Sequence, residues 1–129
     1  MKLVTAAIII KNNHVLLARR KQGQKLAGYW EFPGGKIEKN ETPESCLERE
    51  LFEELNVKIK AGKIIAESIY HYSHCSIKLL GLESILLSNS IKLSVHDKVK
   101  WVPIENTTNL KLAPADIPIA NHLKNRYIS

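Results

Sequence analysis

Apolar residues recur at every second position in most segments of the chain and at helical spacing in two others. An apolar run over about 2–10 and alternation over about 14–20 flank the polar turn Lys11-Asn12-Asn13, and together they predict a β-hairpin. Further strands are predicted at about 30–32, 58–72, 76–87 and 98–102. The two longest alternate apolar and polar residues, as antiparallel strands with one solvated face do.

Helical spacing predicts one helix at about 43–55 and a second at 117–127. Thr42 is placed to cap the first helix, and Pro43 suits its first position. One side of this helix is apolar and carries Leu47, Leu51, Phe52 and Leu55. Strands, a helix, more strands and a closing helix indicate an α/β fold with a mixed β-sheet between helices.

Length and composition favour one domain over residues 1–129, because 129 residues with 44% hydrophobic composition suit a single core. No stretch is apolar for long enough to span a membrane, and no cleavage pattern of a signal peptide follows the first strand. Two cysteines, Cys46 and Cys75, make a poor disulfide framework. We therefore expect a cytoplasmic protein.

The first helix also has an acidic face. Glu50, Glu53 and Glu54 stand at spacings i, i+3 and i+4, which place three carboxylates within one third of the helix circumference. Like charges at these spacings repel each other, so the cluster is best explained by a bound cation. Carboxylate oxygens suit hard divalent ions, above all Mg²⁺, with Mn²⁺ as the alternative.

A glycine turn, Phe32-Pro33-Gly34-Gly35-Lys36, precedes this helix. Paired glycines let the bare backbone approach a metal or a phosphate closely. Lys36 adds an ammonium group beside the turn. The turn, the lysine and the acidic helix face together predict a cradle for a metal-bound polyphosphate.

Charge is distributed unevenly along the chain, whose net charge is +6. Eight of the thirteen acidic residues fall within 31–54, so a basic body surrounds one acidic region. Such a distribution attracts polyanions to the place where a metal gathers, although scattered lysines also serve solubility. Aromatic residues make up 6% of the chain, too few to interleave with a basic patch, so we expect no stable nucleic-acid binding.

The spacing around the acidic helix resembles the Nudix box, Gly-x5-Glu-x7-Arg-Glu-U-x-Glu-Glu-x-Gly-U, where U is a bulky aliphatic residue. The matching positions here are Gly35, Glu41, Arg49, Glu50, Leu51, Glu53, Glu54, Asn56 and Val57. Asn56 replaces the family's last glycine, but Asn is the best substitute for glycine at a left-handed helix C-cap. The resemblance implies the Nudix fold, an α/β/α sandwich, over the whole chain.

The resemblance implies an enzyme that hydrolyses a phosphoanhydride of a nucleotide with the help of Mg²⁺. Glu50, Glu53 and Glu54 would be metal ligands, joined by the backbone carbonyl of Gly34. Either Glu53 or Glu54 would be the general base, and the sequence leaves the two open. Arg49 would complete the catalytic set by holding the glutamates in register.

Further roles follow from the same resemblance. Glu41 would be an outer metal ligand, and Lys36 would contact phosphate. Asp97, the only carboxylate in the loop before Trp101, would be an additional metal ligand. His71, His74 and His96 have no zinc-like spacing on a helix, so we interpret them as strand or loop residues.

The segment from Trp30 to Glu44 is similar to that of the MutT group, whose enzymes hydrolyse 8-oxo-dGTP to the monophosphate and pyrophosphate. Arg20, or its neighbour Arg19, would then contact the nucleotide, and Asp116 would read the base. MutT has asparagine where this chain has Asp116, and an ionised aspartate accepts hydrogen bonds without donating them. The preferred base can therefore differ. Asp116 as a simple helix cap is the competing interpretation.

The leading hypothesis is a Mg²⁺-dependent nucleoside triphosphate pyrophosphohydrolase of MutT type, a housecleaning enzyme of DNA repair. A CTP or modified-dCTP pyrophosphohydrolase is the nearest alternative, and a non-catalytic nucleotide-binding module is a third. The expected partner is a small nucleoside triphosphate rather than a membrane. The sequence leaves a monomer and a homodimer equally open.

Overall fold

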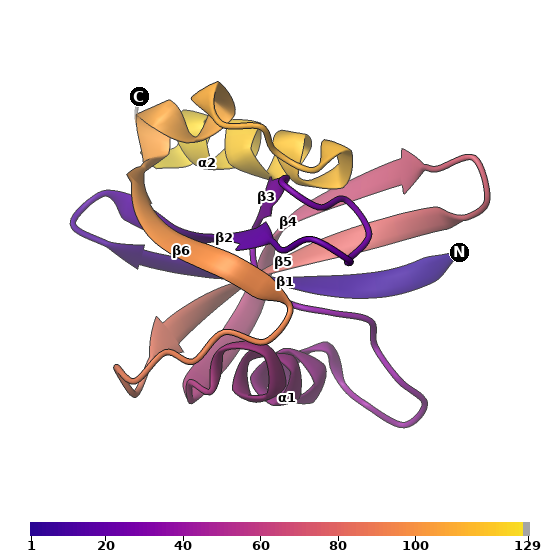
Figure 1. The fold of residues 1–129 in the computed structure, drawn as a ribbon, viewed down its shortest axis with the longest axis horizontal. Coiled ribbons are helices and arrows are strands. Elements are labelled where there is room, and N and C mark those ends of the chain that lie inside the picture. Colours follow the sequence, from indigo (N-terminus) through magenta and orange to yellow (C-terminus); the bar gives the residue numbers. More distant parts are fainter. Residues whose placement is uncertain (128–129) are drawn as a thin grey trace.

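The computed structural model describes residues 1–127, in which helices cover both faces of a six-stranded β-sheet (Figure 1). The strands are β1 (Lys2–Lys11), β2 (His14–Arg20), β3 (Trp30–Glu31), β4 (Ile59–His71), β5 (Ser76–Leu86) and β6 (His96–Pro103). The helices are α1 (Pro43–Leu55) and α2 (Ile117–Tyr127), and two short 3₁₀ helices cover Ile104–Asn109 and Pro114–Asp116. The expected α/β class is confirmed.

Strand order in the sheet is β3-β2-β1-β5-β4, and β6 pairs with β2 along its whole length, from His14 to Arg20. β1 and β5 are parallel, whereas the other pairs are antiparallel, so the sheet is mixed as predicted. The β1–β2 hairpin is paired at its turn, through Ile10 with Val15 and Lys11 with His14. Beyond these pairs the two strands separate, and this opens one edge of β1 to another segment of the chain.

Helix α1 begins and ends where the sequence signals predict. The Thr42 side chain accepts a hydrogen bond from the Ser45 backbone nitrogen at 3.1 Å, and Ser45 Oγ accepts one in return from the Thr42 nitrogen. Asn56 closes the helix in the left-handed conformation, with φ 58°. Phe52 departs from the expected apolar side, because 53% of its surface is exposed.

The core is divided between the two faces of the sheet. Ile8 and Leu17 pack with Ile119 and Leu123 of α2, whereas Ile9 of β1 packs on the α1 side of the sheet. Neighbouring residues of a strand point to opposite faces, which explains why β1 is apolar without alternation. Each fully buried Leu or Ile side chain contributes about 1.5–3 kcal/mol to folding. This packing anchors α1 and the glycine turn to the same sheet.

No helix within residues 1–127 is both long and apolar enough to cross a membrane. Cys46 and Cys75 are both free thiols.

Candidate active site

The glycine turn lies along the open edge of β1 like a short extra strand. The backbone nitrogen of Thr5 donates to the Gly35 carbonyl at 2.8 Å, and that of Ala7 donates to the Pro33 carbonyl at 2.7 Å. Val4 and Lys36 form an antiparallel bridge on the same edge. The turn is therefore fixed by sheet hydrogen bonds and does not project as a free loop.

Two glycines in the turn have no room for a side chain. A Cβ atom at Gly34 would collide with the backbone carbonyl oxygen of Thr5. A Cβ atom at Gly35 would collide with the carboxyl group of Glu50 from α1. The two glycines thus let the turn sit between β1 on one side and the acidic face of α1 on the other.

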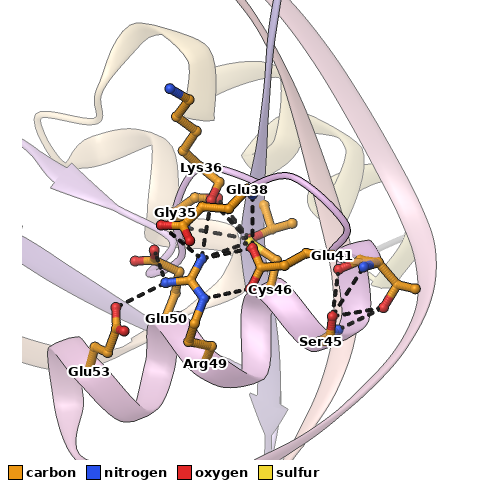
Figure 2. A network of polar contacts seen from close by, with 11 residues as sticks. Gly35, Lys36, Glu38, Glu41, Ser45, Cys46, Arg49, Glu50 and Glu53 are labelled. Carbon is orange, nitrogen blue, oxygen red and sulfur yellow. Dashed lines mark hydrogen bonds and ion pairs between the residues drawn. The ribbon is translucent and has the colours of Figure 1, made fainter.

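Arg49 organises the acidic side chains around the turn (Figure 2). Its Nε and Nη2 atoms donate to the two carboxylate oxygens of Glu41 at 2.6 and 2.9 Å. Its Nη1 atom donates to Glu50 at 2.9 Å and to Glu53 at 3.0 Å. The Nη2 atom also reaches the Lys36 carbonyl at 3.4 Å. One guanidinium therefore joins three glutamates to the turn.

Charge pairing is reflected in the acidity of these groups. Hydrogen bonds from Arg49, supported by the backbone of Glu38, lower the pKa of Glu41 to about 2. Hydrogen bonding to Glu41, followed by the influence of Glu50, raises the pKa of Arg49 above its ordinary value. Glu41 and Arg49 are therefore both charged at neutral pH. Arg49 consequently offsets repulsion among the carboxylates that surround it.

Glu54 differs from its neighbours because it faces inward. Burial, followed by the nearby carboxylates of Glu31 and Glu50, raises the pKa of Glu54 to about 8. Its Oε1 atom is buried and has no hydrogen-bond partner within the described part of the chain. An unpaired buried carboxylate oxygen is costly. A positively charged group beside it would remove this cost.

Two residues outside the predicted set lie beside Glu54. Ligand atoms of Glu31, Glu54 and His96 are all within 4.8 Å of one another. His96 Nε2 is 2.8 Å from Glu31 Oε2, and the His96 side chain is fully buried. The sequence interpretation of His96 as an ordinary strand residue missed this contact. Glu31 had one usable signal, its place immediately before the glycine turn.

Asp97 lies outside this group, although it was expected to be a ligand. Its carboxylate accepts a hydrogen bond from Arg19 Nε at 2.7 Å, which lowers the pKa of Asp97 below its usual value. Successive residues of a strand point to opposite faces, so His96 and Asp97 of β6 diverge. His96 is directed toward Glu31, and Asp97 toward Arg19.

Two adjoining cavities open beside the acidic cluster. The inner cavity has a volume of about 140 Å³, and the outer one about 630 Å³. Residues of the inner cavity include Arg20, Glu31, Phe32, Gly34, Tyr72 and Asp116. The outer cavity has five basic side chains in its lining, namely Lys2, Arg20, Lys25, Lys36 and His74. The predicted residues Arg20, Lys36, Gly34 and Asp116 are thus brought to one connected space.

Hydrogen bonds within the protein fix the side chains of both Arg20 and Asp116. Arg20 donates to the Lys25 carbonyl at 2.7 Å, to Glu31 at 3.1 Å and to Gln24 at 3.2 Å. Asp116 Oδ2 accepts a hydrogen bond from the Phe32 backbone nitrogen at 2.9 Å. This bond joins the 3₁₀ helix before α2 to the first residue of the glycine turn.

The protonation state of Asp116 differs from the sequence expectation. Burial, followed by the charge of Glu31, raises the pKa of Asp116 well above its ordinary value. This environment favours the neutral carboxylic acid, which donates one hydrogen bond and accepts others. Asp116 in this state has the hydrogen-bonding capacity of asparagine rather than that of an ionised aspartate.

Oxygen donors at the cluster fit a hard divalent cation. Backbone carbonyls of Pro33, Gly35 and Lys36 all accept hydrogen bonds, whereas no donor within residues 1–127 reaches the carbonyl of Gly34. The unpaired Glu54 oxygen lies close to Glu50, which in turn lies against Gly35 of the turn, and oxygen atoms of this kind are the ligands that Mg²⁺ and Mn²⁺ prefer.

Comparison with known proteins places this geometry among nucleotide hydrolases. The family model of the NUDIX domain matches residues 1–123. A CTP pyrophosphohydrolase of Escherichia coli is 35% identical over 116 residues, which cover 90% of this chain and 86% of that protein. An 8-oxo-dGTP diphosphatase of Proteus vulgaris is 50% identical over 60 residues, which cover 45% of this chain and 54% of that protein. The solution structure of the E. coli ORF135 protein has a TM-score of 0.86 and 32% identity, covering 99% of this chain and 91% of that one.

Proposed function

The chain belongs to the Nudix family and is a Nudix hydrolase, and from this premise we propose that it is a Mg²⁺-dependent nucleoside triphosphate pyrophosphohydrolase of MutT type. The products would be a nucleoside monophosphate and pyrophosphate. One observation carries the proposal: a buried, unpaired Glu54 oxygen lies close to Glu31 and Glu50, and Glu31 lines the inner cavity that adjoins the basic outer one. A cation that balances these carboxylates also attracts a polyphosphate.

Glu50, Glu54 and the Gly34 carbonyl would hold the cation, with Glu53 on the outer side. When bound, a divalent cation supplies positive charge that draws electron density from the phosphate oxygens and favours attack at phosphorus. Nudix hydrolases generally use divalent ions, and Mg²⁺ is the member of this class that we propose here. Glu31 and His96 lie beside Glu54, with one ligand atom of each within 4.8 Å, and would act as residues that surround a metal ligand.

The remaining site residues act by holding protons and charges in place. Arg49 fixes Glu41, Glu50 and Glu53 at distances of 2.6 to 3.0 Å. Either Glu53 or Glu54 takes the proton of the attacking water in this proposal. Glu53 is 58% exposed and can reach a water directly, whereas Glu54 is enclosed. A comparison of Glu53→Gln with Glu54→Gln over a range of pH separates the two assignments.

Nucleotide recognition would use the two adjoining cavities. Lys36 extends away from the Arg49 network, as Figure 2 shows, and lines the outer cavity, where its ammonium would meet phosphate. Arg20 and Asp116 line the inner cavity, where the base would bind. A neutral Asp116 can donate to a ring acceptor and accept from an amino group, and cytosine presents these two groups side by side.

CTP or a modified dCTP is therefore the second candidate substrate, and a specific observation favours it. The relative named CTP pyrophosphohydrolase matches 90% of this chain, whereas the Proteus 8-oxo-dGTP diphosphatase matches 45%. Neutral Asp116 pairs equally well with oxidised guanine, which also offers a donor beside an acceptor. The base preference needs a direct assay.

Pyrophosphate release from 8-oxo-dGTP, dCTP and CTP, measured with Mg²⁺ and with excess chelator, tests the proposal. We expect fast, chelator-sensitive release from at least one substrate, and loss of that activity in Glu54→Gln. Glu44→Gln is the matched control, because Glu44 is an exposed residue in the first turn of the same helix. Equally slow turnover of all three nucleotides, or activity that survives chelation, contradicts the proposal.

A further inference from the structure

The peptide group between Gly34 and Gly35 has an orientation that its own residues do little to fix. Glycine lacks the Cβ that restricts other residues, so a peptide between two glycines rotates with little steric cost. The carbonyl of this peptide is the one that no donor reaches within residues 1–127. A contact from outside the turn is therefore needed to keep this peptide in one orientation.

Thr5 of β1 contacts this peptide directly. Its Oγ1 atom accepts a hydrogen bond from the Gly35 nitrogen at 3.4 Å and donates one to the Gly35 carbonyl at 3.0 Å. The Thr5 backbone nitrogen donates to the same carbonyl at 2.8 Å. Thr5 is 1% exposed, so water does not replace these bonds. One residue thus binds both polar groups of Gly35.

The backbone ladder alone does not account for the orientation. In a regular antiparallel pair, the Gly35 nitrogen would donate to a backbone carbonyl of the facing strand. Here it donates to the Thr5 hydroxyl instead, and no other acceptor reaches it within the described residues. Within residues 1–127, the hydroxyl is therefore the one direct restraint on this N–H group.

The geometry of the peptide relates the direction of the Gly35 N–H group to that of the Gly34 carbonyl. The chain has no cis peptide bond within residues 1–127, and in a planar trans peptide the C=O and N–H groups point in opposite directions. When the Gly35 N–H group points to Thr5 on β1, the Gly34 carbonyl must point away from β1. Glu50 of α1 lies against Gly35, where a Cβ atom would collide with its carboxyl group.

We propose that Thr5 is a positioning residue, whose side-chain hydroxyl locks the Gly34–Gly35 peptide so that the Gly34 carbonyl faces the carboxylates of α1. The consequence for a cation rests on the proposed function, in which this carbonyl is a ligand. Without the hydroxyl, the peptide samples a flipped orientation that presents an N–H group to the cation site. Both the population of the competent state and the affinity for the cation then fall.

Cys46 of α1 contacts both the Thr5 hydroxyl and the glycine turn. Its Sγ atom is 3.5 Å from Thr5 Oγ1 and 3.4 Å from the Lys36 carbonyl, and the residue is fully buried. The thiol packs against the hydroxyl and keeps the Thr5 side chain turned toward Gly35. Thr5, Cys46 and the turn therefore form one enclosed contact between β1 and α1.

The test compares Thr5→Val, which removes the hydroxyl at nearly constant shape, with Thr5→Ser, which retains it. Thr107→Val is the matched control, because Thr107 is also fully buried and donates its hydroxyl to a carbonyl, that of Ile104, at 2.8 Å. Hydrogen exchange of the Gly35 amide in the metal-free protein reports the lock itself. Calorimetric titration with Mn²⁺ reports its effect on cation binding.

We expect Thr5→Val to accelerate Gly35 amide exchange by about 10-fold or more and to weaken Mn²⁺ binding by about 3- to 10-fold. Thr5→Ser should resemble the wild type in both measurements, and Thr107→Val should change neither. If Thr5→Val does not fold, Thr5→Ala replaces it with the same expected changes. The proposal is overturned if loss of the hydroxyl affects exchange and binding no more than Thr107→Val does.

The two readouts separate this inference from the proposed function. If the wild type binds no divalent cation, the proposed function fails, while the exchange rate of the Gly35 amide still decides whether Thr5 is the lock. If the wild type binds Mn²⁺ and the Thr5 variants bind it equally well, the role of Thr5 is refuted and the proposed function stands.

Discussion

Metal-free protein should lose stability as the pH rises, because Glu54 is buried beside other carboxylates. Its pKa is raised from 4.5 to about 8 in the folded protein. A group with a higher pKa in the folded state than in the unfolded state binds its proton more tightly when the chain is folded. Its contribution to stability is therefore complete below about pH 4.5 and is lost as the pH rises through about 8.

The size of the effect follows from the shift. At 1.36 kcal/mol for each pKa unit, it corresponds to roughly 4–5 kcal/mol between the two extremes. Burial is the main cause of this shift, and the nearby carboxylates of Glu31 and Glu50 add to it. Between about pH 5 and about pH 9, we expect the wild type to lose roughly 2–4 kcal/mol more than Glu54→Gln, which has no charge to bury.

Urea unfolding in the presence of a chelator measures this difference, with fluorescence of Trp30 and Trp101 as the signal. Glu44→Gln should follow the wild type at every pH. Addition of Mg²⁺ at about pH 8 should restore stability to the wild type, by about 2.7 kcal/mol at a hundred times the dissociation constant, and much less to Glu54→Gln. Parallel pH profiles for wild type and Glu54→Gln refute the assignment of a buried, cation-seeking carboxylate.

Three other changes have defined outcomes. Arg49→Lys cannot make the bidentate contact with Glu41 or bridge Glu50 and Glu53. We therefore expect kcat to fall about 10- to 100-fold with little change in the free energy of unfolding. Unchanged steady-state kinetics would contradict this role of Arg49. Gly35→Ala places a methyl group against the Glu50 carboxyl. We expect kcat/KM to fall about 100-fold and thermal melting to show a loss of about 1–3 kcal/mol in stability. Wild-type values in both measurements would show that the turn can shift to accommodate the methyl group. In the wild type, the preference for one nucleotide among 8-oxo-dGTP, dCTP and CTP should decline as rising pH ionises Asp116. In Asp116→Asn, this preference should not change with pH. A preference that depends on pH in both proteins would contradict a neutral Asp116.

Local features of the fold are readable from the sequence because they depend on neighbouring residues. Thr42, Pro43 and Asn56 act through contacts within a few positions, and they set the ends of α1 as expected. Helical periodicity likewise places Glu50, Glu53 and Glu54 on one face. The glycine turn was recognisable for the same reason, since its two glycines are adjacent in the chain.

Contacts between distant segments account for what the sequence did not reveal. Glu54 lies beside Glu31 and His96, which are 65 positions apart in the chain and meet at 2.8 Å. Asp97 is drawn away by Arg19 from a strand 78 positions earlier. Such pairings depend on how β2, β3 and β6 align in the sheet, and no local pattern specifies that alignment.

The protonation of Asp116 also depends on contacts between distant segments. Its bond to the Phe32 nitrogen spans 84 positions, and its burial is produced by packing of the segment before α2 against the sheet. A side chain read as a charged acceptor in the sequence thereby lies in surroundings that raise its pKa and favour the neutral form. The sequence identified the residue, and the tertiary structure determines its chemistry.

Binding of a divalent cation to the metal-free protein is the decisive measurement. Calorimetric titration with Mn²⁺ should show binding to the wild type and to Glu44→Gln with equal affinity. For Glu54→Gln, we expect the affinity to fall by about 10-fold or more, because the enclosed carboxylate supplies the charge that balances the ion. Equal affinity in all three proteins, or no binding to the wild type, contradicts the assignment of this cluster as a cation site.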